Sequence, residues 1–268
     1  MQADRIKWVD YAKGLSIMLV VIYHSSFISA NSELYHHSIS FFNEILVRMR
    51  MPLFFFMSGL FIHKAMSMDL KLFYKFKIMH LLYLYVLWSI IRYFTSSIPE
   101  HIVRGSTEGG LTSIFTIFFN PPSTLWFIYA LLLFMLFTRL TKPYHVIALF
   151  VSIIMFIVIT EFGIDGFITK LFSFYPCYLL GYLTSDITKR IFQRFKLYYL
   201  LFVIVYFAVI ISTADQSWTQ SGLGILLFSM GGIVAGIIIA MMLCRTLAAS
   251  WLEYIGRNTL PIYLMHFL

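Results

Sequence analysis

Apolar runs of about 20 residues recur along the whole chain and are separated by short polar or charged segments. A helix that crosses a bilayer core about 30 Å thick needs roughly this many consecutive apolar residues. Only 12% of the 268 residues are charged, whereas a soluble domain has about 25%. The sequence therefore predicts an all-α fold, a polytopic bundle of transmembrane helices that forms a single integral-membrane domain over residues 1–268.

Polar boundaries divide the chain into nine expected spans. They lie near residues 12–30, 41–63, 77–96, 124–140, 145–161, 167–184, 198–213, 222–243 and from 255 onward. The last apolar run stops at Leu268 after about a dozen residues, and a helix of that length is too short to cross a bilayer. We therefore expect about nine spans of an original ten, in a chain that is truncated at its C-terminal end.

The positions of the charged residues predict the orientation of the bundle. Alternate connections are basic, as with Lys71 and Lys75 before the third span and Lys189 after the sixth. The other connections are acidic, as with Glu161 and Asp165. Since cytoplasmic loops are enriched in lysine and arginine, we expect a multi-pass protein of a bacterial cytoplasmic membrane with its N-terminus in the cytoplasm. The formal net charge of +8 then follows from topology and requires no nucleic-acid partner.

Ionisable residues within the spans are the candidate functional residues, because a charge is costly in the hydrocarbon core and usually serves a function there. His24 lies near the middle of the first span, and Lys13 lies about three helical turns before it on the same face. The second span brings Arg48 and Arg50 to a comparable depth. Residues two apart do not share a helix face, so we expect one of these arginines to face His24. His266 reaches a similar depth in the last run.

Lys77 and His80 lie at the cytoplasmic start of the third span and are adjacent on one helix face. Such residues also have purely structural interpretations: a histidine can hydrogen-bond to a neighbouring helix, and an interfacial lysine can extend to the head groups. The sign of the charges favours a ligand, because almost no carboxylate lies in the middle of a span. A basic channel of this kind suits a phosphate-bearing cofactor. The two cysteines lie in apolar runs, and we expect no metal site.

Five segments resemble, in order, those of the membrane-bound acyltransferase family 3, which includes fucose 4-O-acetylase-like proteins. The segments are DYAKGLSIMLVVIYH, MPLFFFMSGLF, STLWFIYALLLF, YPCYLLGYL and IGRNTLPIYLMH. Lys13 and His24 match the first-helix motif of this family, in which a basic residue precedes a histidine. Lys77 and His80 stand where relatives have two arginines, which removes bidentate phosphate recognition. Arg50 stands where similar relatives often have a histidine.

The resemblance implies an O-acetyltransferase that moves an acetyl group from cytoplasmic acetyl-CoA, or another acyl-CoA, to a hydroxyl of a cell-envelope or exported glycan. No metal is implied. His24 would act as the base that accepts the hydroxyl proton or would carry the acetyl group covalently, and a histidine is suited to this because its ordinary pKa is near neutrality. Arg50, or alternatively Arg48, would stabilise the oxyanion.

The remaining candidate residues divide between donor and acceptor. We expect Lys13, Lys77 and His80 to bind the phosphates of the cofactor at the cytoplasmic edge. Arg48 and His266 are expected to bind the glycan or lipid-linked sugar acceptor.

Two other classes of protein fit the same residues. A non-enzymatic transporter or flippase of a lipid-linked or anionic solute would use the same basic groove for passage. A structural membrane subunit would use these residues for packing alone. Acetyl transfer that depends on acetyl-CoA distinguishes the enzyme from both alternatives.

Overall fold

The computed structural model describes residues 6–28, 33–97, 116–122, 125–246 and 249–266. Helices make up the regular structure of these residues, and no strand occurs among them. The predicted all-α class is confirmed.

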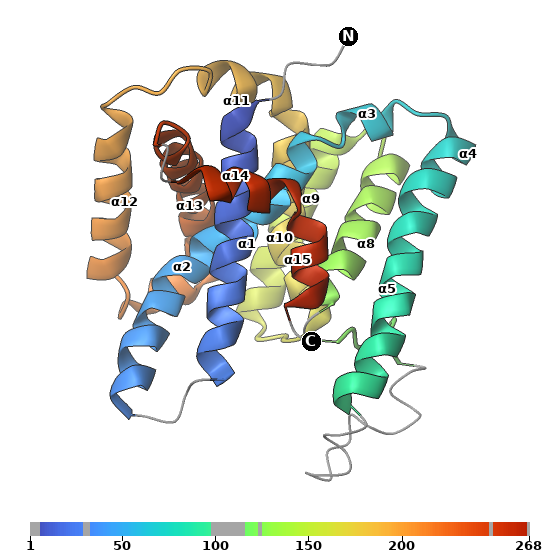
Figure 1. The fold of residues 1–268 in the computed structure, drawn as a ribbon, viewed down its shortest axis with the longest axis horizontal. Helices are drawn as coiled ribbons and strands as arrows, with labels where there is room; N and C mark the ends of the chain where they lie inside the picture. Colours follow the sequence, from blue (N-terminus) through green and yellow to red (C-terminus); the bar gives the residue numbers. More distant parts are fainter. Residues whose placement is uncertain (1–5, 29–32, 98–115, 123–124, 247–248, 267–268) are drawn as a thin grey trace.

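The helices run up and down through one bundle (Figure 1). The longer ones are α1 (Lys7–Ile28), α2 (Glu33–Leu60), α5 (Met79–Arg92), α8 (Trp126–Leu140), α9 (His145–Glu161), α10 (Phe167–Leu183), α12 (Tyr199–Ser212) and α13 (Gly222–Leu243). The short elements are α3 (His63–Met66), α4 (Leu70–Phe73), η1 (Tyr74–Ile78), η2 (Tyr93–Ser97), α11 (Ser185–Ile191), η4 (Ser217–Gln220), α14 (Ser250–Arg257) and α15 (Thr259–Met265). We call the end of the bundle at which α1 begins and α3 and α11 lie the α3 end; it is at the top of Figure 1.

The predicted number of spans is not confirmed. By length and composition, two helical stretches of the described chain suffice to cross a membrane: Leu70–Thr95, with 26 residues, and Gly222–Leu243, with 22. Three further apolar helices, α8, α9 and α12, are shorter. The 14 residues of α12 give a length of about 21 Å, less than the roughly 30 Å of a bilayer core.

The run expected to span from residue 255 onward is divided into two short helices. The backbone of Asn258 leaves the helical conformation, with φ −116° and ψ 30°, and separates α14 from α15. α14 lies across the bundle, whereas α15 runs along it (Figure 1). α14 carries an ion pair between Glu253 and Arg257. Because of this polar face, α14 and α15 do not form one continuous apolar span.

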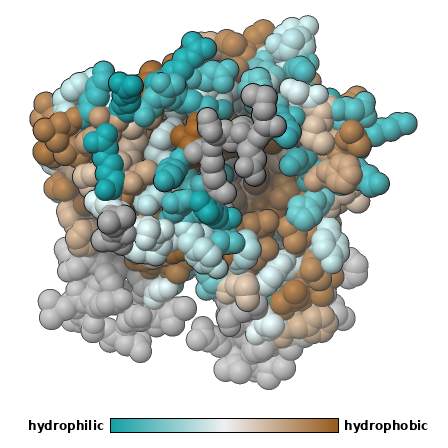
Figure 2. Space-filling model, turned by 45° about the horizontal axis from the view of Figure 1, so that its top comes forward, coloured by the Kyte–Doolittle hydropathy of each residue, from teal (hydrophilic) through white to brown (hydrophobic). Residues whose placement is uncertain are grey.

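Apolar side chains cover the flanks of the bundle, whereas hydrophilic residues gather at the α3 end (Figure 2). On α9, large side chains such as Ile147, Phe150 and Ile154 are exposed, and on α12 so are Leu201 and Ile204. An apolar surface of this extent is unfavourable in water and marks a site of membrane or protein contact. The distribution therefore fits a bundle whose flanks face lipid.

Glycines allow a close contact between the backbones of α2 and α10. A Cβ atom added at Gly59 would lie 1.9 Å from the carbonyl oxygen of Tyr178, and one at Gly181 would lie 2.2 Å from that of Phe56. Small residues at helix interfaces let backbones approach and gain van der Waals contact, which helices in a membrane require because apolar burial provides little force between them. The two helices are therefore held together backbone to backbone.

We expect Gly59→Ala to lower the free energy of unfolding by at least about 1–3 kcal/mol, because the new methyl group overlaps a backbone oxygen that cannot rotate away. Thermal unfolding of the detergent-solubilised protein measures this loss. Gly163→Asn is the control: Gly163 has φ 64° and open space around its Cβ position, and asparagine tolerates this conformation. Equal stability of the Gly59→Ala variant and wild type would contradict the packing described.

Candidate functional site

The described helices bring four polar or aromatic side chains together inside the bundle. The ring of His24 on α1 lies 5.4 Å from the ring of His266, which directly follows α15, and 4.9 Å from that of Tyr23. The guanidinium carbon of Arg50 on α2 lies 3.9 Å from the centre of the Tyr23 ring. We call His24, His266, Arg50 and Tyr23 the histidine cluster.

Arg50 places a positive charge in the interior of the bundle, since only 4% of its surface is exposed. Removing a guanidinium from water is costly unless nearby groups compensate. The face of the Tyr23 ring provides such compensation, because an aromatic quadrupole attracts a cation. The Tyr23 ring lies next to that of His24, so the guanidinium and the imidazole belong to one cluster. A negative charge that develops beside His24 would therefore be stabilised.

A hydrogen bond fixes the protonation pattern of His266. Its Nδ1 atom lies 2.6 Å from the backbone oxygen of Tyr263. Because a carbonyl oxygen only accepts, Nδ1 carries the proton, and Nε2 is the basic nitrogen of the neutral ring. The same bond orients the imidazole ring toward its neighbours in the histidine cluster.

A cavity of about 320 Å³ lies near the α3 end. Lys13 from α1, Lys77 from η1 and His80 from α5 all line it, together with apolar side chains of α2 and α8 and the start of α15. We call it the lysine cavity. Lys13 thus meets Lys77 and His80, which are far from it in the sequence, at one opening. The three basic groups of this cavity can hold an anion against a largely apolar wall.

Tyr263 connects the lysine cavity with the histidine cluster. It lines the cavity, and its ring lies 5.6 Å from that of His266. The backbone N–H of Phe127 donates to its hydroxyl at 3.3 Å. Side-chain contacts therefore lead without a break from the cavity through Tyr263 and His266 to His24.

The sequence did not predict a role for Tyr23 or Tyr263. A signal for both is present in the chain, because Tyr23 directly precedes His24 and Tyr263 lies one helical turn before His266. An aromatic residue beside each histidine of a span is thus a feature that a sequence search can use.

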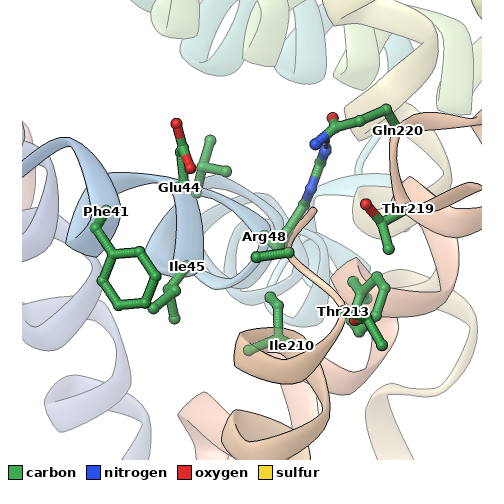
Figure 3. Close-up of a pocket in the computed structure, with 11 residues that line it drawn as sticks. Phe41, Glu44, Ile45, Arg48, Ile210, Thr213, Thr219 and Gln220 are labelled. Carbon is green, nitrogen blue, oxygen red and sulfur yellow. Dashed lines mark hydrogen bonds between the residues drawn. The ribbon is translucent and has the colours of Figure 1, made fainter. Parts of the chain in front are cut away.

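Arg48 extends from α2 toward Gln220 (Figure 3). Its Nη2 donates to Gln220 Oε1 at 2.7 Å. It lines a separate cavity of about 280 Å³, which also includes Glu44 and Thr213. Of the two arginines, therefore, only Arg50 belongs to the histidine cluster. A role of Arg48 in binding the acceptor stays a prediction.

The chemical capacity of the site follows from these groups. The cluster combines histidine nitrogens that can exchange a proton with a buried guanidinium that can stabilise an oxyanion. Within the described part of the chain, no group of three or more histidine, cysteine, aspartate or glutamate residues is placed to hold a metal ion.

Comparison with known proteins identifies the family. The model of the acyltransferase family 3, described as an acyltransferase domain, matches residues 6–268. The inner membrane protein YcfT of Escherichia coli (strain K12) is 26% identical over 199 residues, which are 65% of this chain and 55% of the relative. This chain thus spans about half the length of that curated relative. No solved structure matches this chain. Because the family model covers nearly the whole sequence, the chain belongs to the membrane-bound acyltransferase family 3.

Proposed function

We propose that the protein is an integral-membrane O-acyltransferase, which moves an acetyl group from acetyl-CoA, or another acyl group from its CoA ester, to a hydroxyl of a cell-envelope or exported glycan. The observation that carries this proposal is that Tyr263 lines the basic lysine cavity and also lies beside His266, whose ring is next to that of His24. This arrangement supports a donor whose phosphates bind in the cavity while its thioester lies near the histidine cluster. Membership of the family supports acyl transfer as the reaction.

In this proposal the α3 end faces the cytoplasm, where acyl-CoA is found. Lysine and arginine residues of short loops favour the cytoplasmic side. The α3 end carries Lys64, Lys71, Lys75, Lys189 and Arg190, whereas the connections at the opposite end carry Glu161, Asp165 and Asp215. The phosphates of the donor lie against Lys13, Lys77 and His80, and its thioester extends toward Tyr263.

His24 is the general base of the proposed reaction. The acceptor oxygen attacks the thioester carbonyl as its proton passes to His24, and Arg50 stabilises the resulting oxyanion. The carbon–sulfur bond then breaks, and the same proton passes to the departing thiolate of CoA. His266, fixed by its bond to Tyr263, holds the acceptor hydroxyl beside His24.

Transfer of labelled acetate from acetyl-CoA by the purified protein in liposomes tests the function directly. Mass spectrometry of envelope glycans from cells with and without the protein identifies the acceptor through the acetyl groups that differ. The charged cavity also fits a transporter, and movement of an anionic solute without acetyl-CoA, together with no acetyl transfer, would contradict the enzyme.

We expect His24→Ala to lower acetyl transfer by about 10²–10⁴-fold, the usual contribution of a positioned general base. Abundance in the membrane should stay close to that of wild type, because His24 is only half-buried. His63→Ala is the control, since His63 is exposed and stacks on Tyr182 outside the cluster. If the His24→Ala variant keeps most of the activity, His24 serves packing and not catalysis.

The two arginines of α2 should differ in kinetics. Arg50→Gln is expected to lower kcat by about 10²–10³-fold, the effect of removing an oxyanion donor. Arg48→Gln should instead raise the KM for the acceptor and change kcat little, because Arg48 lies on another face of α2. Steady-state kinetics with both substrates varied measures the two effects, and a reversed pattern would exchange the proposed roles.

Donor binding should depend on the lysine cavity. Lys77→Ala is expected to raise the KM for acetyl-CoA about three- to ten-fold, since a lysine contact to phosphate contributes on the order of 1 kcal/mol. His80→Arg should preserve or lower this KM, because arginine binds phosphate with two parallel hydrogen bonds. Lys75→Ala is the control, because Lys75 is exposed on the same η1 segment but does not line the cavity.

If Lys77→Ala and His80→Arg both leave the KM for acetyl-CoA at the value of Lys75→Ala, these two residues contact lipid and the donor enters elsewhere.

A further inference from the structure

A second cavity lies at the α3 end, on the other side of α1. It has a volume of about 510 Å³ and lies between the start of α1, the end of α11 and the end of α13. Three of its described lining residues are cationic, Lys7, Lys189 and Arg245, and none is acidic. The cavity therefore concentrates positive charge where hydrophilic residues gather (Figure 2).

Trp8 gives this cavity an unsatisfied hydrogen-bond donor. The residue lines the cavity and is only 6% exposed, and its Nε1 atom is buried without a hydrogen-bond partner. Buried donors in proteins are nearly always paired, because a buried donor without a hydrogen bond is costly. An acceptor atom of a ligand that reaches this N–H group would satisfy it.

The cations are held in place by other groups of the protein. Arg245 donates to the backbone oxygen of Phe195 at 3.4 Å, and its guanidinium carbon lies 4.8 Å from the Phe195 ring. Lys189 donates to Ser185 Oγ at 2.7 Å. Both side chains keep further N–H donors, because a guanidinium has five and an ammonium has three. Fixed cations with donors to spare are suited to a multivalent anion.

The nearby carboxylate does not neutralise this charge. The carboxylate of Glu253 on α14 forms an ion pair with Arg257. The first turn of α1, which includes Lys7 and Trp8, adds the positive end of a helix dipole. The same turn carries Asp10, which does not line the cavity. The described lining of the cavity is therefore positive.

The second cavity also adjoins the lysine cavity. The ring of Phe61, which lines the lysine cavity, has the ammonium of Lys13 4.6 Å from its centre and that of Lys189 5.4 Å from its centre. Lys189 lines the second cavity. A single aromatic ring thus separates the two, and a ligand with several phosphates can reach both.

We propose that the second cavity is a phosphate-binding site. It takes a phosphate ester, whose oxygens accept hydrogen bonds from Arg245, Lys189 and the indole N–H of Trp8. Two sources have this chemistry, a phosphate group of a CoA-type nucleotide that also occupies the lysine cavity and the head group of an anionic phospholipid. This inference concerns binding alone and does not require the proposed transfer reaction to occur.

Binding measurements on the full chain test this site. CoA and 3′-dephospho-CoA are titrated by equilibrium dialysis against detergent-solubilised protein. Retention of phosphatidylglycerol relative to phosphatidylcholine is measured by native mass spectrometry. The variants are Arg245→Gln, which removes an exposed cation, and Trp8→Phe, which keeps a smaller aromatic ring and removes the donor. Arg194→Gln is the matched control, because Arg194 is also exposed and close to α11 but does not line the cavity.

We expect Arg245→Gln to weaken binding of one phosphate ligand about ten-fold or more, the usual effect of losing a charge-assisted hydrogen bond. Trp8→Phe should weaken binding of the same ligand several-fold, and Arg194→Gln should leave its binding unchanged. Weaker binding of CoA but not of 3′-dephospho-CoA identifies the 3′-phosphate as the occupant, and equal weakening of both identifies the diphosphate. Loss of phosphatidylglycerol alone identifies the lipid. Unchanged binding of all probes in both variants overturns the proposal.

Discussion

Close contact between helix backbones along α2 is the constraint on which the rest of the bundle depends. Gly59 and Gly181 bring α2 against α10, and Gly232 brings α13 against it, where an added Cβ would lie 2.5 Å from the carbonyl oxygen of Arg48. Helices surrounded by lipid gain little from burying apolar surface against each other, so the fit of their surfaces decides their arrangement. The position of α2 in turn decides where its two arginines point, and therefore where positive charge enters the interior.

The distribution of charge across the molecule follows a simple order. Cations lie around two cavities at the α3 end, and one buried guanidinium lies deeper, beside two histidines. Several of these cations lie against aromatic rings, such as the ring of Tyr23 for Arg50 and the ring of Phe61 for Lys13. An aromatic ring compensates a cation without neutralising its charge, so the positive potential remains available to an anionic ligand.

Much of this arrangement could be predicted from the sequence. Apolar periodicity located the long helices closely, and depth along each helix indicated that Lys13, Lys77 and His80 would lie at one end. Helix geometry also predicted that one of two arginines faces His24, but not which one, because that depends on the rotation of α2 against α13. The division at Asn258 was not predicted, since a run of apolar residues does not reveal where a helix leaves its axis.

The second cavity could not be predicted from the sequence either. Lys7, Lys189 and Arg245 come from three separate segments, and each resembles an ordinary charge near the membrane surface. Only the fold places them around one cavity, together with Trp8.

The contact between α14 and α1 has a consequence for the spacing of the two histidines. Cβ atoms added at Gly14 and Gly256 would lie 2.2 Å from the backbone oxygen of Leu252 and 1.7 Å from that of Asp10, so α14 is seated directly on the backbone of α1. Since α15 and His266 follow α14 after a single residue, His266 is positioned from the same helix that carries His24. A tilt or slide of α1 within the membrane would carry both imidazoles with it, so their separation would be preserved while their distance from Arg50 on α2 changed.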